Sequence, residues 1–245
     1  MGEVCAATRL RGLGDELRKQ RPDRFEASGE RQGKGVRAIL KSLGRALVLS
    51  AATASVVGLA AAPALAASTW TVKPGGKLMA TAGTTTLTDS TANQSITCTS
   101  SVAKGTLKTG SGLSGKSLGT VASLAFTGCT ILSMNVSATI KGTMPLNGIS
   151  YNATKKTASM TITKIHGTIT VPGLSCSATI DGTSGTAHNG MVKATFTNKT
   201  STLKVLSTGG NLHLYNVTCP VIANNDSVNF TGGYKFSPKT TITSP

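Results

Sequence analysis

Four cysteines beyond residue 90 are the residues whose spacing most directly indicates a chemistry. They are Cys98, Cys129, Cys176 and Cys219. An even number of cysteines in an oxidising compartment is typical of a disulfide framework, and four cysteines allow three pairings. We favour pairing in sequence order, Cys98 with Cys129 and Cys176 with Cys219. A zinc site is the alternative, but the chain has no Cys-x-x-Cys pair.

Residues for acid–base chemistry are scarce. The histidines are His166, His188 and His213, and the acidic residues beyond residue 66 are Asp89, Asp181 and Asp226. Each aspartate lies in a turn context such as Asp181-Gly182, so we interpret the three as turn caps rather than as the paired carboxylates of a glycosidase. We interpret each histidine as structural, although spacing alone does not exclude a Ser-His-Asp arrangement. We therefore predict no catalytic residue, metal ligand or cofactor.

Positive charge dominates the part of the chain beyond residue 66. It contains 14 lysines, no arginine, three aspartates and no glutamate, which gives a net charge of +11. Without arginine the chain lacks the planar, bidentate donor that suits specific nucleic-acid recognition. The lysines are interpreted as a solvated face that protects sheet edges, or alternatively as a means of attraction to anionic envelope polymers or lipid surfaces.

Aromatic residues are few, and two of them suggest a binding surface. Trp70 and Tyr151 could form a platform on which a sugar ring stacks. Phe196, Phe230 and Phe236 alternate with polar residues and are expected in the core.

Alternation with a period of two indicates that strands position these residues. Met134, Val136, Ala138 and Ile140 alternate with polar residues, and similar runs occur at 174–181, 192–197 and 228–236. Turn sequences such as Asn189-Gly190 separate the runs. We predict an all-β fold, an antiparallel β-sandwich or barrel of about ten to twelve strands.

Two local features interrupt this pattern. The apolar phase slips by one residue between Ile162 and Ile165, which predicts a bulge near Lys164. Residues 103–120 contain five glycines and are expected to form a long Gly/Ser loop or hairpin tip.

A weak internal repeat, in which Ile96-Thr-Cys98 resembles Leu174-Ser-Cys176, suggests that residues 67–245 comprise two related halves.

An export signal precedes the β-rich part. Arg37, Lys41 and Arg45 lead into an apolar stretch at 46–62, and Pro63 and Ala64-Leu65-Ala66 follow. A basic flank, an apolar core and an A-x-A site are typical of a secretory signal peptide, including its signal helix. We predict a signal peptide at 36–66 and a mature domain at 67–245, with an uncleaved membrane anchor as the alternative.

Residues 1–35 do not fit this signal peptide, which normally begins close to the start of its chain. Val36 opens a well-proportioned signal peptide of its own, and a valine codon can serve as a bacterial start. We interpret residues 1–35 as an over-called extension and expect translation to begin at Val36; a long charged N-terminal region starting at Met1 is the alternative.

The mature chain resembles a group of uncharacterised exported, β-rich proteins of actinobacteria. The resemblance is carried by Cys176-Ser-Ala-Thr-Ile-Asp-Gly-Thr183 and by the segment from Thr208 to Cys219, which follow a long alanine-rich signal. It implies an extracytoplasmic location and supplies no activity.

These observations favour an exported, non-enzymatic protein with a structural or binding role, secreted or associated with the cell envelope. A carbohydrate- or lipid-binding module is the alternative, for which a concave aromatic patch would be diagnostic. A secreted hydrolase is the second alternative, for which a histidine meeting an aspartate in a pocket would be diagnostic.

Overall fold

The computed structural model describes residues 69–245, and this part of the chain is all-β. The predicted extension, signal peptide, signal helix and cleavage site lie outside the described residues. Within residues 69–245 no helix is long and apolar enough to span a membrane. The strands are β1 (Thr69–Lys73), β2 (Gly76–Ala82), β3 (Thr85–Asp89), β4 (Gln94–Leu107), β5 (Gly110–Ser114), β6 (Gly119–Ile131), β7 (Met134–Ile140), β8 (Met144–Asn152), β9 (Thr157–Ile165), β10 (Gly167–Val171), β11 (Cys176–Asp181), β12 (Gly190–Thr197), β13 (Thr202–Val205), β14 (His213–Tyr215), β15 (Val228–Ser237) and β16 (Thr241–Thr243), with a short 3₁₀ helix at Pro172–Leu174.

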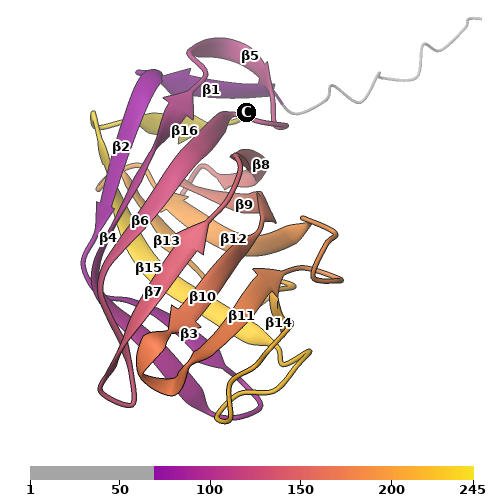
Figure 1. Cartoon of the computed structure of the whole chain (residues 1–245). Coiled ribbons are helices and arrows are strands. Elements are labelled where there is room, and N and C mark those ends of the chain that lie inside the picture. Colours follow the sequence, from indigo (N-terminus) through magenta and orange to yellow (C-terminus); the bar gives the residue numbers. More distant parts are fainter. Residues whose placement is uncertain (1–68) are drawn as a thin grey trace, which may run out of the picture. The chain divides into compact units, whose positions relative to one another are not determined.

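Eight of these strands close into an antiparallel barrel, in the order β4-β6-β8-β9-β12-β13-β15-β2. Of the two architectures expected from the sequence, the barrel is therefore the one adopted. The long strands β4, β6 and β15 continue past this ring (Figure 1). Their extensions pair with β3 and β7, and β7 continues the sheet through β10, β11 and β14. A bridge between His213 and Ser227 brings β14 beside the start of β15. The extensions of the long strands therefore form a second ring together with β3, β7, β10, β11 and β14.

The described residues contain more strands than the ten to twelve predicted, because long strands are interrupted where the rings meet. β7 and β8 run consecutively along β6 with a break at Lys141–Thr143, and β9 passes into β10 at His166. The bulge predicted near Lys164 is confirmed: Gly190 pairs with Ile165 and Val192 pairs with Ile162. Lys164 has a φ of 61°, which accommodates the extra residue.

One end of the barrel is covered by the small sheet β16-β1-β5 (Figure 1). Trp70 on β1 and Ile242 on β16 are buried beneath it, at 1% and 0% exposure. The ring of Trp70 lies against Gly148 of β8, where a Cβ atom would meet Trp70 Cε2 at 2.6 Å.

The glycine-rich region 103–120 is not the loop expected from its composition. It forms the end of β4, all of β5 and the start of β6. Gly105 is paired with Val121, and a side chain on Gly105 would overlap the carbonyl oxygen of Thr120. Glycine here permits close approach of two strands rather than chain mobility.

Two disulfides join Cys98 to Cys129 and Cys176 to Cys219, the pairs expected from the sequence. Cys98 and Cys129 are direct partners on β4 and β6. Cys219 lies beyond β14, and its disulfide links the segment after β14 to the first residue of β11, Cys176. Both bridges therefore belong to the second ring.

Candidate ligand-binding cavity and its basic rim

An apolar cavity of about 90 Å³ lies inside the barrel where the two rings meet. Strands of both rings line it, because alternate residues of every strand point inward. Only two of the lining residues carry a polar side-chain atom, Thr85 and Tyr234. The others are Leu78, Ala80, Leu87, Ile96, Cys98, Ala103, Val121, Leu124, Phe126, Ala138, Ile140, Met144, Leu146, Ile162, Ile165, Ile169, Ile180, Val192, Leu203, Val205, Leu212, Phe230 and Phe236.

Tyr234 is held in the cavity wall by one buried hydrogen bond. Ser101 Oγ donates to Tyr234 Oη at 2.8 Å, and the two residues are 1% and 5% exposed. Burial raises the pKa of Tyr234 to about 12, because an ionised phenolate would lose its hydration in this apolar surrounding. The phenol is therefore neutral at physiological pH.

The wall of the second ring has a window between β6 and β7, next to the barrel. β6 pairs with β8 over Gly119–Val121 and with β7 over Cys129–Ile131. Between these stretches, residues 122–128 of β6 and residues 137–143 of the facing chain have no ladder partner on that side. The sheet is therefore open along this border, and we call this opening the window.

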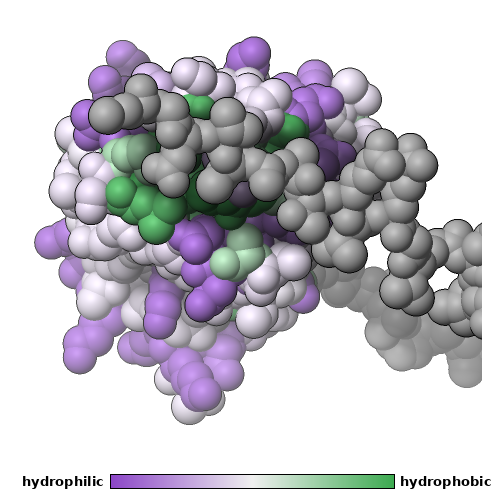
Figure 2. All heavy atoms as spheres, turned by 60° about the horizontal axis from the view of Figure 1, so that its bottom comes forward, coloured by the Kyte–Doolittle hydropathy of each residue, from purple (hydrophilic) through white to green (hydrophobic). Residues whose placement is uncertain are grey.

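Cavity-lining residues are partly exposed along the window. Leu124 and Phe126 on β6, and Ala138 and Ile140 on β7, line the cavity but are only half-buried. Figure 2 shows hydrophobic residues gathered in a hollow among hydrophilic surroundings on this face. Large apolar surfaces left open to solvent usually mark a binding site.

Basic residues surround one end of the window. A second hollow, of about 510 Å³, is lined by Lys141, Gly142, Thr143, Lys164, His166 and His188, and we call these residues the basic rim. Lys141–Thr143 also form one border of the window. Their neighbours Ile140 and Met144 line the cavity, so the rim lies directly outside the cavity wall. Lys141 N donates to the carbonyl of His166 at 2.8 Å and joins the two sides of the rim.

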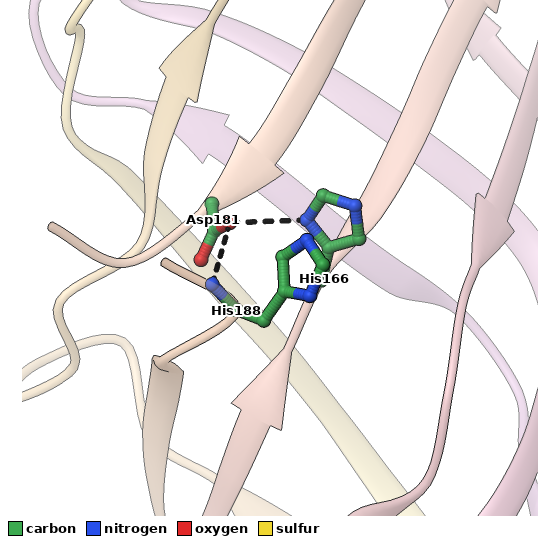
Figure 3. Close-up of side chains that lie close together, drawn as sticks. All are labelled: His166, Asp181 and His188. Atoms are coloured by element: carbon green, nitrogen blue, oxygen red, sulfur yellow. Dashed lines mark hydrogen bonds and ion pairs between the residues drawn. The ribbon is translucent and has the colours of Figure 1, made fainter. Parts of the chain in front are cut away.

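Asp181 positions the histidines of the rim. It ends β11 and is completely buried, and its carboxylate accepts a hydrogen bond from His166 Nδ1 at 3.0 Å. The same carboxylate accepts the backbone N–H of His188 at 3.0 Å and so closes the turn that carries this residue. The two imidazole rings lie against each other, with centroids 3.9 Å apart (Figure 3).

All hydrogen-bonding positions of the Asp181 carboxylate are used. Besides the two bonds to the histidines, Oδ1 accepts from Gly182 N at 2.6 Å and from Asn189 N at 3.1 Å. Burial opposes ionisation, but these hydrogen bonds together hold the pKa of Asp181 below its ordinary value. An ionised carboxylate only accepts, so Nδ1 of His166 carries a proton and Nε2 is the nitrogen left for a ligand.

A metal ion would find few ligands in this cluster. One possible ligand atom from each of His166, Asp181 and His188 lies within 4.8 Å of the others. A carboxylate offers about four lone-pair positions, and four N–H donors already occupy those of Asp181. Two imidazoles remain, whereas catalytic zinc sites use three protein ligands.

The meeting of His166 with Asp181 is the feature that the sequence analysis set as diagnostic of a hydrolase. A hydrolytic triad also needs a nucleophile hydrogen-bonded to the histidine. Among residues 69–245 no serine, threonine or cysteine side chain makes this bond. Ser117 lies in a Gly-x-Ser-x-Gly sequence at 115–119, but it sits in a turn between two strands, whereas a nucleophile elbow joins a strand to a helix.

The remaining candidate residues have structural roles. Asp89 accepts the backbone N–H groups of Thr91 and Ala92, and Asp226 accepts that of Ala223, so both cap turns as expected. His213 Nδ1 lies 3.0 Å from the carbonyl oxygen of Asn211.

The predicted sugar platform is wrong for Trp70, because this residue is buried beneath the small sheet. Tyr151 is half-buried on β8. No aromatic patch that includes Trp70 is therefore open to a sugar ring.

Sequence reasoning missed the cavity, the window and the basic rim. The one available sign was the phase slip at Lys164, which marks the place where β9 bends into β10 and places His166 at the rim. Comparisons with protein-family models, curated proteins and solved structures find no match. The resemblance to exported actinobacterial proteins therefore stays a prediction.

Proposed function

We propose that this chain is an exported, non-enzymatic binding protein whose barrel takes up the alkyl part of a lipid-like ligand. The observation that carries the proposal is the apolar cavity that continues to the window between β6 and β7. Eight-stranded barrels have an interior wide enough to hold one small ligand. Apolar cavities with few polar groups are the usual form of sites for such ligands.

The size of the cavity limits how the ligand can lie. An apolar cavity of about 150 Å³ is enough for a benzene molecule, and the volume here is about 90 Å³. The cavity would therefore hold the end of an alkyl chain, and the rest of the chain would lie in the window against Leu124, Phe126 and Ile140. This placement would cover the half-exposed side chains that the unpaired strands leave open.

Binding of a neutral apolar probe tests this function. We expect decan-1-ol, a neutral probe whose alkyl chain is narrow enough for the cavity, to bind the purified protein saturably, with one probe per chain. Replacing Ala138 by phenylalanine should weaken binding by at least about tenfold, because the added ring would fill the cavity from β7. Isothermal titration calorimetry measures the affinity and the stoichiometry.

Ala125→Phe is the matched control. Ala125 lies across the window on β6 but is exposed and does not line the cavity. This variant should bind the probe like the original protein. Failure of the original protein to bind, or equal binding by Ala138→Phe, would count against the cavity as a ligand site.

We further propose that anionic surfaces attract the protein. All 14 lysines are exposed, whereas Asp89, Asp181 and Asp226 are buried at 3%, 0% and 8% exposure. Residues 69–245 therefore present no acidic side chain on their surface. A uniformly positive surface favours association with anionic polymers or lipid headgroups.

Salt dependence tests this attraction. We expect the protein to bind phosphatidylglycerol vesicles at low salt, and binding should fall steeply toward about 0.5 M salt, because screening shortens the range of the interaction. Phosphatidylcholine vesicles are the control and should not bind. A single change such as Lys199→Ala should have little effect in a sedimentation assay, since the attraction is spread over many lysines. Salt-independent binding would contradict a charge-driven mechanism.

A further inference from the structure

The basic rim and the apolar cavity are adjacent parts of one opening. Lys141–Thr143 form a border of the window and also line the rim, while Ile140 and Met144 beside them line the cavity. A molecule that enters the cavity through this part of the window must pass Lys141. Its outer end would then lie among the side chains of the rim.

The rim has the chemistry of an anion site. Lys141, Lys164 and His188 are exposed, and each lysine ammonium group carries a positive charge and three N–H donors. Among residues 69–245, Asp181 is the only acidic residue in contact with the rim. Its carboxylate is buried and accepts four N–H groups, and the two lysines of the rim outnumber it, so the rim keeps a net positive charge.

The rim is held in a fixed arrangement rather than formed by free side chains alone. The hydrogen bond from Lys141 N to the carbonyl of His166 links the β7–β8 and β9–β10 connections. Asp181 fixes the ring of His166 and the backbone of His188. The backbone that carries the lysines is therefore preorganised, and only their side chains lose conformational entropy when a ligand binds.

We propose that the ligand of the barrel is an anionic amphiphile, whose carboxylate or phosphate group is held at the rim by the ammonium groups of Lys141 and Lys164. This inference rests on the proposed function, because it assigns the polar end of the same ligand. The alkyl chain extends from the rim through the window into the cavity. The charged group stays at the solvent boundary, where burial does not remove its hydration.

Probes with the same chain and different head groups test this proposal. Isothermal titration calorimetry would compare decan-1-ol, decanoate and decyl phosphate. We expect at least one of the two anions to bind about tenfold more tightly than the alcohol, because charged hydrogen bonds are stronger than neutral ones. The two anions distinguish a carboxylate from a phosphate ligand.

The double variant Lys141→Gln/Lys164→Gln should remove most of the preference for anions and leave binding of decan-1-ol unchanged. The matched control is Lys155→Gln/Lys156→Gln. It removes the same charge from an exposed turn outside the rim, and Lys156 shares the positive φ of Lys164 (52° and 61°). The control should keep the preference, because its lysines do not face the ligand.

The outcomes separate the two proposals. Equal binding of alcohol and anions, or an anion preference that survives in Lys141→Gln/Lys164→Gln, would overturn the anionic head group and leave the binding function standing. No binding of any ten-carbon probe would overturn the binding function itself. Suppose that inorganic phosphate binds as tightly as decyl phosphate and that Ala138→Phe affects neither. The rim would then be an anion site independent of the cavity, which would overturn the anionic head group as part of the ligand of the barrel.

Discussion

Replacing Trp70 by alanine should lower the free energy of unfolding by about 3–5 kcal/mol, the range for removing a buried aromatic side chain. Trp70 is 1% exposed and lies between the small sheet and the end of the barrel. Its loss leaves a cavity beside Gly148 and Leu118 that the surrounding strands can fill only in part. Urea unfolding followed by far-UV circular dichroism measures the change.

A double-mutant cycle shows whether the effect comes from this contact. A Cβ atom on Gly148 would lie 2.6 Å from the ring of Trp70. Gly148→Ala should therefore destabilise the original protein more than the Trp70→Ala background, where only Leu118 Cδ1, at 2.9 Å, still crowds the added carbon. Met79→Ala removes an exposed apolar side chain and serves as the control. Additive effects of the Trp70 and Gly148 changes would show that this packing is not what secures the end of the barrel.

The sequence predicted the strands themselves better than it predicted which strands pair with one another. Alternation along 192–197 correctly identified Val192, Ala194 and Phe196 as buried. Alternation shows which side chains face inward, but it does not show which strand lies alongside. Lys235 pairs with Thr81 although most of the described chain lies between them, and no local pattern in either strand encodes this. Closure into a barrel therefore could not be separated from a sandwich.

The candidate site depends on contacts of the same non-local kind. Asp181 was correctly interpreted as a turn cap, but the turn it caps also returns His188 to the ring of His166. The window is invisible in the sequence because β6 alternates in the same way whether or not its edge is paired. The apolar side chains of β7 were expected to face inward, and they do: Met134, Val136, Ala138 and Ile140. They are half-exposed, because β7 begins at its hairpin with β6 and then borders the window.

The second large effect concerns Tyr234, and we expect it in the pH dependence of stability. The pKa of Tyr234 is raised to about 12 in the folded protein from an ordinary value of 10.0. Below pH 10 the phenol is neutral in the folded and in the unfolded protein, and its contribution to the free energy of unfolding is fully present. Between pH 10 and 12 the unfolded chain loses this proton while the folded protein keeps it. The free energy of unfolding should therefore fall by about 1.4 kcal/mol for each pH unit, or roughly 2.7 kcal/mol in all.

The test compares two proteins over the same pH series, so that pH effects common to both cancel. Tyr234→Phe alone would leave the buried hydroxyl of Ser101 without its partner, and the suitable reference is therefore Ser101→Ala/Tyr234→Phe. Urea unfolding at intervals from pH 8 to about 11.5 gives the difference in free energy between the two proteins at each pH. This difference should be constant up to about pH 10. Above that pH the original protein should lose stability relative to the double variant, because only the original protein contains the buried phenol. A difference that stayed constant across the series would mean that water reaches the phenol, and the cavity beside Tyr234 would then not be the dry, apolar space that binding of an alkyl chain requires.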